Sequence, residues 1–113
     1  MNFIYHLITP KNVKTLARLK HVKCYGFGKD IHRGFICCST YDQVWKTYLE
    51  KYSHHQKMKV LCLDVLSFPK DTVKWELRIK KNGEQVMYPH IHGSFTWNQS
   101  VVNVRNVKCF KEF

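Results

Sequence analysis

The residues best suited to chemistry lie in the segment Tyr88-Pro89-His90-Ile91-His92-Gly93. Alternate side chains of an extended strand point to opposite faces, so Tyr88, His90 and His92 share one face, where a phenol meets two imidazoles. Imidazoles exchange protons near neutral pH and ligate metals when neutral. Pro89 cannot donate a hydrogen bond to a neighbouring strand, which indicates an edge strand or a bulge, and such places often border binding sites.

The same two imidazoles raise the alternative of a metal site. His90 and His92 have a spacing that many metal sites use, and His6 or Cys37 could complete the set. No carboxylate motif accompanies the pair, and imidazoles also bind phosphates or main-chain carbonyl groups. The sequence therefore assigns no metal ligand, and a metal-binding protein stays an alternative.

Several familiar chemistries lack their sequence signatures. The chain contains no GxxxxGK[ST], GxGxxG, GxSxG or helical HExxH motif. P-loop ATP hydrolysis, Rossmann cofactor binding, α/β-hydrolase acyl transfer and zinc-protease chemistry are therefore not indicated.

Composition indicates a folded and strongly basic protein. Nineteen Lys and Arg residues against eight Asp and Glu residues give a formal net charge of +11, which attracts nucleotides, nucleic acids or acidic proteins without selecting among them. The five cysteines form no CxxC pair and are expected to be reduced thiols of an intracellular protein. No segment resembles a signal peptide or a membrane span. We expect a cytoplasmic protein without a membrane partner, with a nuclear location left open.

The elements that must position these residues follow from hydrophobic periodicity and turn signals. Strands are expected over residues 2–8, 34–40, 59–65, 73–79, 85–91 and 101–110, helices from Thr9-Pro10 and from Thr40 to near Ser53, and a short extended piece over 22–25. Thr40 and Gln43 fit a capping box, and Asn82-Gly83 predicts a hairpin. This order predicts one compact α+β domain over residues 1–113, with a mixed or split, antiparallel-rich sheet and two main helices.

Two predictions concern which way side chains face. The alternation over 73–79 predicts that Val73, Trp75, Leu77 and Ile79 point toward the core and that Glu76 points away from them. The junction of the strand over 34–40 with the following helix gathers backbone N–H groups. With the hydroxyls of Ser39 and Thr40 it predicts a corner for a phosphate or ribose oxygen, although Thr40 could equally cap its own helix.

Four motifs together resemble the family called domain of unknown function 952. Its members show YH, GFIHCST, V-x-W/Y-E and FPHIYG in this order and at similar spacing. The matching segments here are Tyr5-His6, residues 34–40 followed by Gln43-Val44, the trio Val73, Trp75 and Glu76, and residues 88–93. The sequence departs from the pattern twice, because Cys37 replaces the usual histidine and His92 replaces the usual tyrosine.

The resemblance implies an ADP-ribosyltransferase-like fold, a split sheet that holds NAD or ADP-ribose between its halves. It implies that His6 bonds a ribose or phosphate oxygen and that His90 lies where a catalytic glutamate usually sits. Ribosyl transfer passes through an oxocarbenium-like state that a carboxylate stabilises, and Glu76 is the nearest candidate. The implied catalytic residues are His6, Glu76 and His90, and the implied ligand-binding residues are Tyr5, Ser39, Thr40, Tyr88 and His92.

Three functions of different classes follow. The first is a domain that binds NAD or a related nucleotide as substrate and catalyses ribosyl or phosphoryl transfer, and it predicts that His6, Ser39 and His90 converge on one cleft. The second is a non-catalytic basic module that binds nucleotides or RNA through charge and aromatic stacking. The third is a metal-binding protein that uses His90 and His92.

Overall fold

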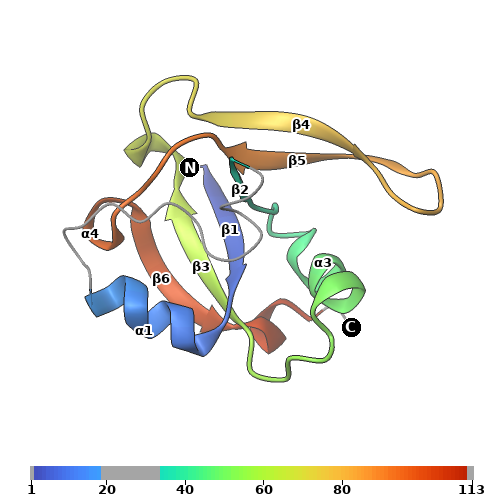
Figure 1. Cartoon of the computed structure of the whole chain (residues 1–113), viewed down its shortest axis with the longest axis horizontal. Coiled ribbons are helices and arrows are strands. Elements are labelled where there is room, and N and C mark those ends of the chain that lie inside the picture. Colours follow the sequence, from blue (N-terminus) through green and yellow to red (C-terminus); the bar gives the residue numbers. More distant parts are fainter. Residues whose placement is uncertain (1, 19–33, 112–113) are drawn as a thin grey trace.

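Two three-stranded antiparallel sheets organise the chain in the computed structural model, which describes residues 2–18 and 34–111 (Figure 1). The first sheet has the order β1-β3-β6, from strands Phe3–Ile8, Lys59–Asp64 and Val101–Asn106. The second has the order β2-β5-β4, from strands Ile36–Cys37, Gln85–Ile91 and Val73–Ile79. The helices are α1 (Pro10–Arg18), α3 (Val44–Lys51) and α4 (Trp97–Ser100), and 3₁₀ turns cover Val65–Ser67 and Val107–Phe110.

The expected α+β class is confirmed, and the two sheets agree with the expected split. Every strand pairing among the described residues is antiparallel, so the mixed alternative does not apply to them. The strand expected over 34–40 is shorter, because only Ile36–Cys37 pairs as a strand and Ser39 makes an isolated bridge. The piece expected over 22–25 lies outside the described residues.

The first sheet is buried on both faces, which explains the nearly continuous apolar sequence of its central strand β3. Leu61 and Leu63 pack with Leu16 of α1 on one face. On the other face, Val60 packs with Val44 of α3. Each such side chain contributes about 1.5–3 kcal/mol when it is withdrawn from water. The sheet is therefore the rigid base of the molecule.

Both main helices begin near their predicted signals. Thr9 caps α1, because its Oγ1 accepts the N–H of Asn12 at 3.3 Å. The capping box predicted before α3 is partly formed: Oε1 of Gln43 accepts the N–H of Thr40 at 3.0 Å, but Gln43 itself occupies the cap position of a helix that starts at Val44. None of the described helices is long and apolar enough to cross a membrane.

A projecting hairpin formed by β4 and β5 is the most distinctive feature of the fold (Figure 1). Gly83 has φ +86°, a left-handed conformation that glycine adopts without strain, and Oδ1 of Asn82 accepts the N–H of Glu84 at 2.9 Å. The Asn-Gly signal thus correctly predicted where the chain reverses. The turn closes with the N–H of Gly83 donating to the carbonyl of Lys80 at 2.9 Å.

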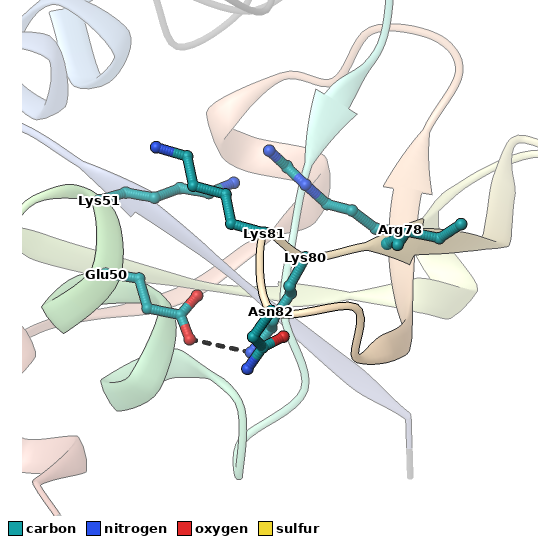
Figure 2. A pocket seen from close by; sticks show the side chains of 7 residues that line it. Glu50, Lys51, Arg78, Lys80, Lys81 and Asn82 are labelled. Atoms are coloured by element: carbon teal, nitrogen blue, oxygen red, sulfur yellow. Dashed lines mark hydrogen bonds and ion pairs between the residues drawn. The ribbon is translucent and has the colours of Figure 1, made fainter.

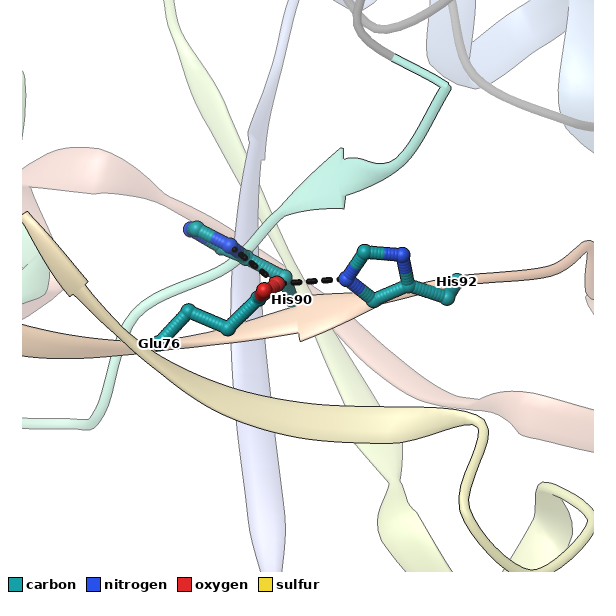
Figure 3. Close-up of side chains that lie close together, drawn as sticks. All are labelled: Glu76, His90 and His92. Carbon is teal, nitrogen blue, oxygen red and sulfur yellow. Dashed lines mark hydrogen bonds and ion pairs between the residues drawn. The ribbon is translucent and has the colours of Figure 1, made fainter.

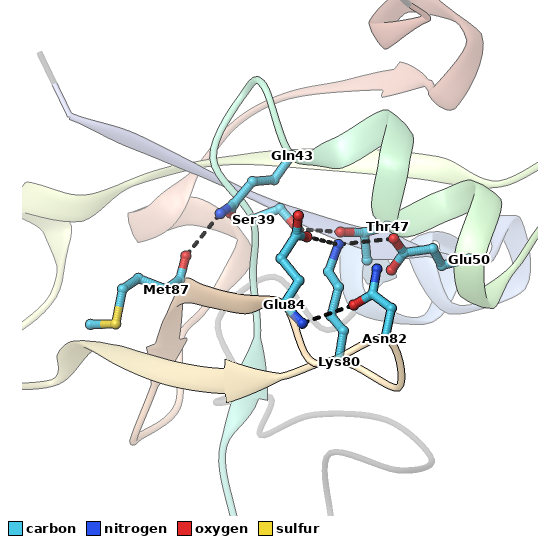
Figure 4. Close-up of polar contacts among 8 residues, drawn as sticks. All are labelled: Ser39, Gln43, Thr47, Glu50, Lys80, Asn82, Glu84 and Met87. Atoms are coloured by element: carbon cyan, nitrogen blue, oxygen red, sulfur yellow. Dashed lines mark hydrogen bonds and ion pairs between the residues drawn. The ribbon is translucent and has the colours of Figure 1, made fainter.

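Two side-chain contacts tie the hairpin to the region of α3 (Figure 4). Nε2 of Gln43 donates to the carbonyl of Met87 at 2.8 Å, near the middle of β5. Nζ of Lys80, beside the turn, lies 2.9 Å from Oε1 of Glu50 in α3 and 3.2 Å from Oε1 of Glu84. The hairpin is therefore held at two points along its length.

The prediction for the outer face of β4 was wrong. Trp75, Leu77 and Ile79, expected in the core, are 52%, 55% and 65% exposed, and only Val73 of that row packs against buried residues. The alternation itself is present, but among the described residues no layer covers this face of the projecting part of the hairpin. Because the row points to solvent, Glu76 lies on the opposite, partly covered face.

The two sheets meet where β1 passes β2. Tyr5 and Ser39 exchange a pair of backbone hydrogen bonds, with N–O distances of 2.9 and 2.8 Å. Next to this bridge, Nδ1 of His6 lies 2.8 Å from the carbonyl oxygen of Cys37. A main-chain bridge and one imidazole therefore join the sheets at this point.

Candidate functional site

The register of the hairpin gathers the chemically active side chains on one face of β4 and β5. Glu76 is the cross-strand partner of Tyr88, and Lys74 is the partner of His90. Cross-strand partners share a face, and so do residues two apart on one strand. We call this face, made of Lys74, Glu76, Arg78, Tyr88 and His90, the polar face of the hairpin.

Glu76, His90 and His92 form a compact cluster on the polar face (Figure 3). Nδ1 of His90 lies 2.9 Å from Oε1 of Glu76. Nε2 of His92, one residue beyond β5, contacts the same carboxylate oxygen. The predicted sharing of one face by His90 and His92 is thus confirmed, and a carboxylate from the neighbouring strand joins them.

The cluster lies at the boundary between the protein interior and solvent. His90 is 7% exposed, and its ring stacks on the ring of Phe35, with centroids 4.4 Å apart and planes inclined by 21°. The ring of His92 lies 5.3 Å from the same phenyl ring, on the outer side. Phe35 therefore orients the inner imidazole, while Glu76 and His92 remain accessible to a ligand.

The two imidazoles also favour the ionised form of the carboxyl group. Hydrogen bonds from His92 and then from His90 lower the pKa of Glu76 below its usual value. Glu76 is therefore a carboxylate at neutral pH. An ionised oxygen beside two ring nitrogens can ligate a cation, accept a proton or stabilise developing positive charge.

These three residues also meet the spatial requirement for a metal ion. One ligand atom from each residue can be chosen so that all three lie within 4.8 Å of one another. Ligand atoms bound about 2.0–2.2 Å from one zinc ion lie roughly 3 Å apart or more. The 2.9 Å separation of Nδ1 and Oε1 is close to that spacing. The three ligand atoms are therefore close enough to one another to share one cation.

His6 lies outside this cluster. It occupies a buried row of β1 with Ile4 and Ile8, is 8% exposed, and contacts the Cys37 carbonyl. Cys37 is the cross-strand partner of His90, so His6 is connected to the cluster through the main chain of β2. The structure thus gives His6 a main-chain partner on β2, the strand that pairs with β5 at His90.

The Ser-Thr corner has partners from within the protein. The N–H of Ser39 donates to Tyr5, and the N–H of Thr40 donates to Gln43. Oγ of the buried Ser39 lies 3.5 Å from Oγ1 of Thr47 in α3. These backbone groups therefore hold strand and helix together in this structure.

The two tyrosines implied as ligand-binding residues lie apart. Tyr88 belongs to the polar face, buried opposite Glu76. Tyr5 packs edge-on against Tyr41 and Phe110, with centroids 5.7 and 5.4 Å away. Burial, followed by interactions with Cys62, raises the pKa of Tyr5. Of this pair, Tyr88 is the one beside the cluster.

Phe35 is a site residue that residue patterns did not single out for a role. Its position before Ile36 in a predicted strand gave no hint that its ring covers His90. The sequence did contain a signal that groups Glu76 with the histidines. The Asn-Gly turn fixes the register of the two strands, and the alternation places Glu76 on the face opposite Trp75. Combining these two observations predicts a Glu-His-His face.

Comparison with known proteins identifies a family and a shared fold. The model of the family described as "Protein of unknown function (DUF952)" matches residues 6–104. No protein with curated annotation matches the chain. The crystal structure of protein CC0527 from Caulobacter crescentus is similar, with a TM-score of 0.75 and 17% identity over 93% of this chain and 85% of that one. The solution structure of CC0527 gives a TM-score of 0.73 and 19% identity over 94% and 84%. At these identities the similarity shows the fold alone.

Proposed function

The chain belongs to DUF952, a family described only as proteins of unknown function, and from the site itself we propose that it binds a divalent transition-metal ion through Glu76, His90 and His92. The observation that carries the proposal is the convergence of one ionised carboxylate and two imidazoles within 4.8 Å. Glu76 comes from β4 and the histidines from the end of β5, so one hairpin supplies the whole set.

The types of ligand favour particular metals. Imidazole nitrogen suits Zn²⁺, Fe²⁺, Co²⁺ and Ni²⁺, and two histidines with one carboxylate form a set that leaves coordination positions open. Structural zinc sites are usually closed by four protein ligands, whereas catalytic sites keep a position for water or substrate. We therefore infer a reactive centre, at which the metal would act as a Lewis acid or activate water.

The surroundings support this assignment. Stacking on Phe35 limits rotation of the His90 ring, as the packing around metal ligands commonly does. His92 and Glu76 lie on the accessible side, where an ion can enter and a substrate can approach. The site thus combines one fixed ligand with two accessible ones.

Metal titration tests the proposal. We expect chelator-treated protein to bind one Zn²⁺ or Co²⁺ ion with a rise in melting temperature, because an ion that binds the folded state stabilises it by mass action. Glu76→Gln and His92→Ala should each weaken binding by about tenfold or more, since losing even an outer-shell partner of a metal typically costs about that much. Isothermal titration calorimetry and the visible spectrum of Co²⁺ measure both effects.

His54 and His55 provide the matched control. Their rings lie 4.7 Å apart in an exposed turn away from the hairpin, so a His54→Ala, His55→Ala variant removes two imidazoles without touching the cluster. It should retain the affinity of the wild type within about twofold. Equal binding by the wild type and Glu76→Gln, or loss of binding only in the control variant, would refute the metal centre.

The second candidate function assumes an ADP-ribosyltransferase-like fold. The domain would bind a nucleotide or dinucleotide of the NAD or ADP-ribose class and catalyse ribosyl or phosphoryl transfer. The observation that favours it is the ionised Glu76 beside His90, since a carboxylate can stabilise an oxocarbenium-like state. Tyr88 on the same face would contact the ribose.

Metal removal separates the two candidates. If the second holds, NAD or ADP-ribose should raise the melting temperature of chelator-treated protein, because this binding needs no metal ion. Release of nicotinamide from NAD, measured by chromatography, should disappear in Glu76→Gln. A thermal shift that requires added metal would instead favour the metal centre.

A further inference from the structure

A cavity of about 410 Å³ lies where the hairpin turn approaches the end of α3 (Figure 2). The turn supplies Arg78 through Asn82, and α3 supplies Glu50 and Lys51. The ion pair between Lys80 and Glu50 fixes the two elements relative to each other. The cavity therefore has walls from two parts of the chain that are held in place.

The charges of the lining residues are strongly unbalanced. Four of the seven are cations, namely Lys51, Arg78, Lys80 and Lys81, and Glu50 is the single carboxylate. Glu50 is engaged by Lys80, with Nζ and Oε1 2.9 Å apart. That bond raises the pKa of Lys80, which stays protonated at any physiological pH. The cavity is therefore suited to an anion with more than one negative charge.

Arg78 connects the cavity with the metal-binding cluster. It lines the cavity and also lies two residues beyond Glu76 on the polar face of the hairpin. Two residues along a strand span about 7 Å, so a ligand whose anionic end fills the cavity needs only a short extension along the hairpin to reach Glu76. The guanidinium can also bind phosphate through two parallel hydrogen bonds.

We propose that this cavity binds the diphosphate group of a small molecule of the nucleoside diphosphate class, whose other end extends along the polar face toward Glu76, His90 and His92. The placing of that other end rests on the proposed metal centre, whereas diphosphate binding by Arg78 and the lysines does not. The cavity thus gives the candidate reactive centre a substrate class.

The acidic residues around the turn favour a small ligand over a nucleic-acid strand. Glu50 and Glu84 both lie against Lys80, at 2.9 and 3.2 Å. A polymer follows a continuous basic path, and these carboxylates interrupt such a path at the tip of the hairpin. A compact diphosphate needs only a few cations, such as Arg78 and Lys81, while both carboxylates are paired with Lys80.

Calorimetry with pyrophosphate, ADP and adenosine on chelator-treated protein tests the proposal. Pyrophosphate and ADP should bind and adenosine should not. An Arg78→Ala, Lys81→Ala variant should bind both anions about tenfold or more weakly, because charge-assisted hydrogen bonds to the phosphates are lost. Lys81 is exposed and Arg78 half-buried, and an unchanged melting temperature would show that the variant is folded.

A Lys14→Ala, Lys108→Ala variant is the matched control, since it removes two exposed positive charges from α1 and the last 3₁₀ turn. It should keep the wild-type affinities within about twofold. If both double variants bound the anions equally weakly, the effect would come from net charge alone and the proposal would be wrong. It would also be wrong if the wild type bound neither pyrophosphate nor ADP. Stronger binding of a 12-nucleotide RNA than of ADP, lost in the cavity variant, would reassign the cavity to a polymer and likewise overturn it.

Added Zn²⁺ tests whether the metal centre and the diphosphate site bind one ligand together. It should tighten ADP binding in the wild type but not in Glu76→Gln. If no metal binds while the cavity variant still loses ADP, the metal centre is wrong and the diphosphate site stands. If metal binds but leaves ADP affinity unchanged, the claim that the ligand reaches the cluster is wrong.

Discussion

At the scale of single residues, the proposed cation binding depends on the arrangement around one oxygen of Glu76. Both imidazoles contact Oε1, and their hydrogen bonds lower the pKa of the carboxyl group. Such an oxygen either accepts hydrogen bonds from the two rings or shares a cation with them. The ring of Phe35 over His90 favours a fixed geometry in both states.

His6 illustrates the other use of a buried imidazole. Replacing it with Ala removes the contact with the Cys37 carbonyl and leaves a small void in the row of Ile4 and Ile8. We expect the free energy of unfolding to fall by about 1–3 kcal/mol, while metal affinity stays within about twofold of the wild type. Urea denaturation and metal titration on one preparation measure both quantities.

His6→Phe is the companion variant, because it keeps the ring volume without the nitrogen atoms. It should recover part of the lost stability through packing. Intact stability combined with lost metal or ADP binding in either variant would instead place His6 among the ligand-binding residues, as the family resemblance implies.

At the scale of elements, the hairpin divides into the polar face and an exposed apolar face. Leu77 is 55% exposed on the outer face of β4, whereas Leu63 in β3 is fully buried. Leu77→Ala should change the free energy of unfolding by no more than about 0.5 kcal/mol, and Leu63→Ala should lower it by about 2–5 kcal/mol. Chemical denaturation of the two variants compares the same substitution in two environments.

A loss near that of Leu63→Ala for Leu77→Ala would mean that a further layer covers the hairpin in solution. Analytical ultracentrifugation of both variants would then show whether self-association accounts for the loss. The comparison thus tests the exposure of the row that includes Trp75 and Ile79.

The positions of the strands were largely predictable, but the burial of one face was not. Residues 73–79 and 85–91 were predicted with the observed bounds, because alternation and an Asn-Gly turn are local signals. Which face of β4 is covered depends on how far the hairpin projects past the first sheet. That distance is set by contacts such as Gln43 with Met87, which join distant parts of the chain.

At the scale of the whole molecule, the two sheets have different structural roles. The first is covered by helices on both faces and contributes residues to both hydrophobic clusters. The second carries the cluster and one wall of the basic cavity. The connection through Tyr5, Ser39 and His6 is small, so the reactive side chains lie beside the core rather than within it.

The candidate site was predictable in part for the same reason. His90, His92 and Tyr88 were found from the sequence because a strand places them together, and Glu76 was named as the nearest carboxylate. The covering ring of Phe35 and the cavity between the hairpin and α3 depend on tertiary packing. Local patterns contain no information on such distances between separate elements.

The continuity of the hairpin has a practical consequence. Residues 76–92 contain all three candidate metal ligands and five of the seven residues that line the cavity. This segment could therefore be grafted as one unit into another protein that has an antiparallel strand pair and one supporting helix.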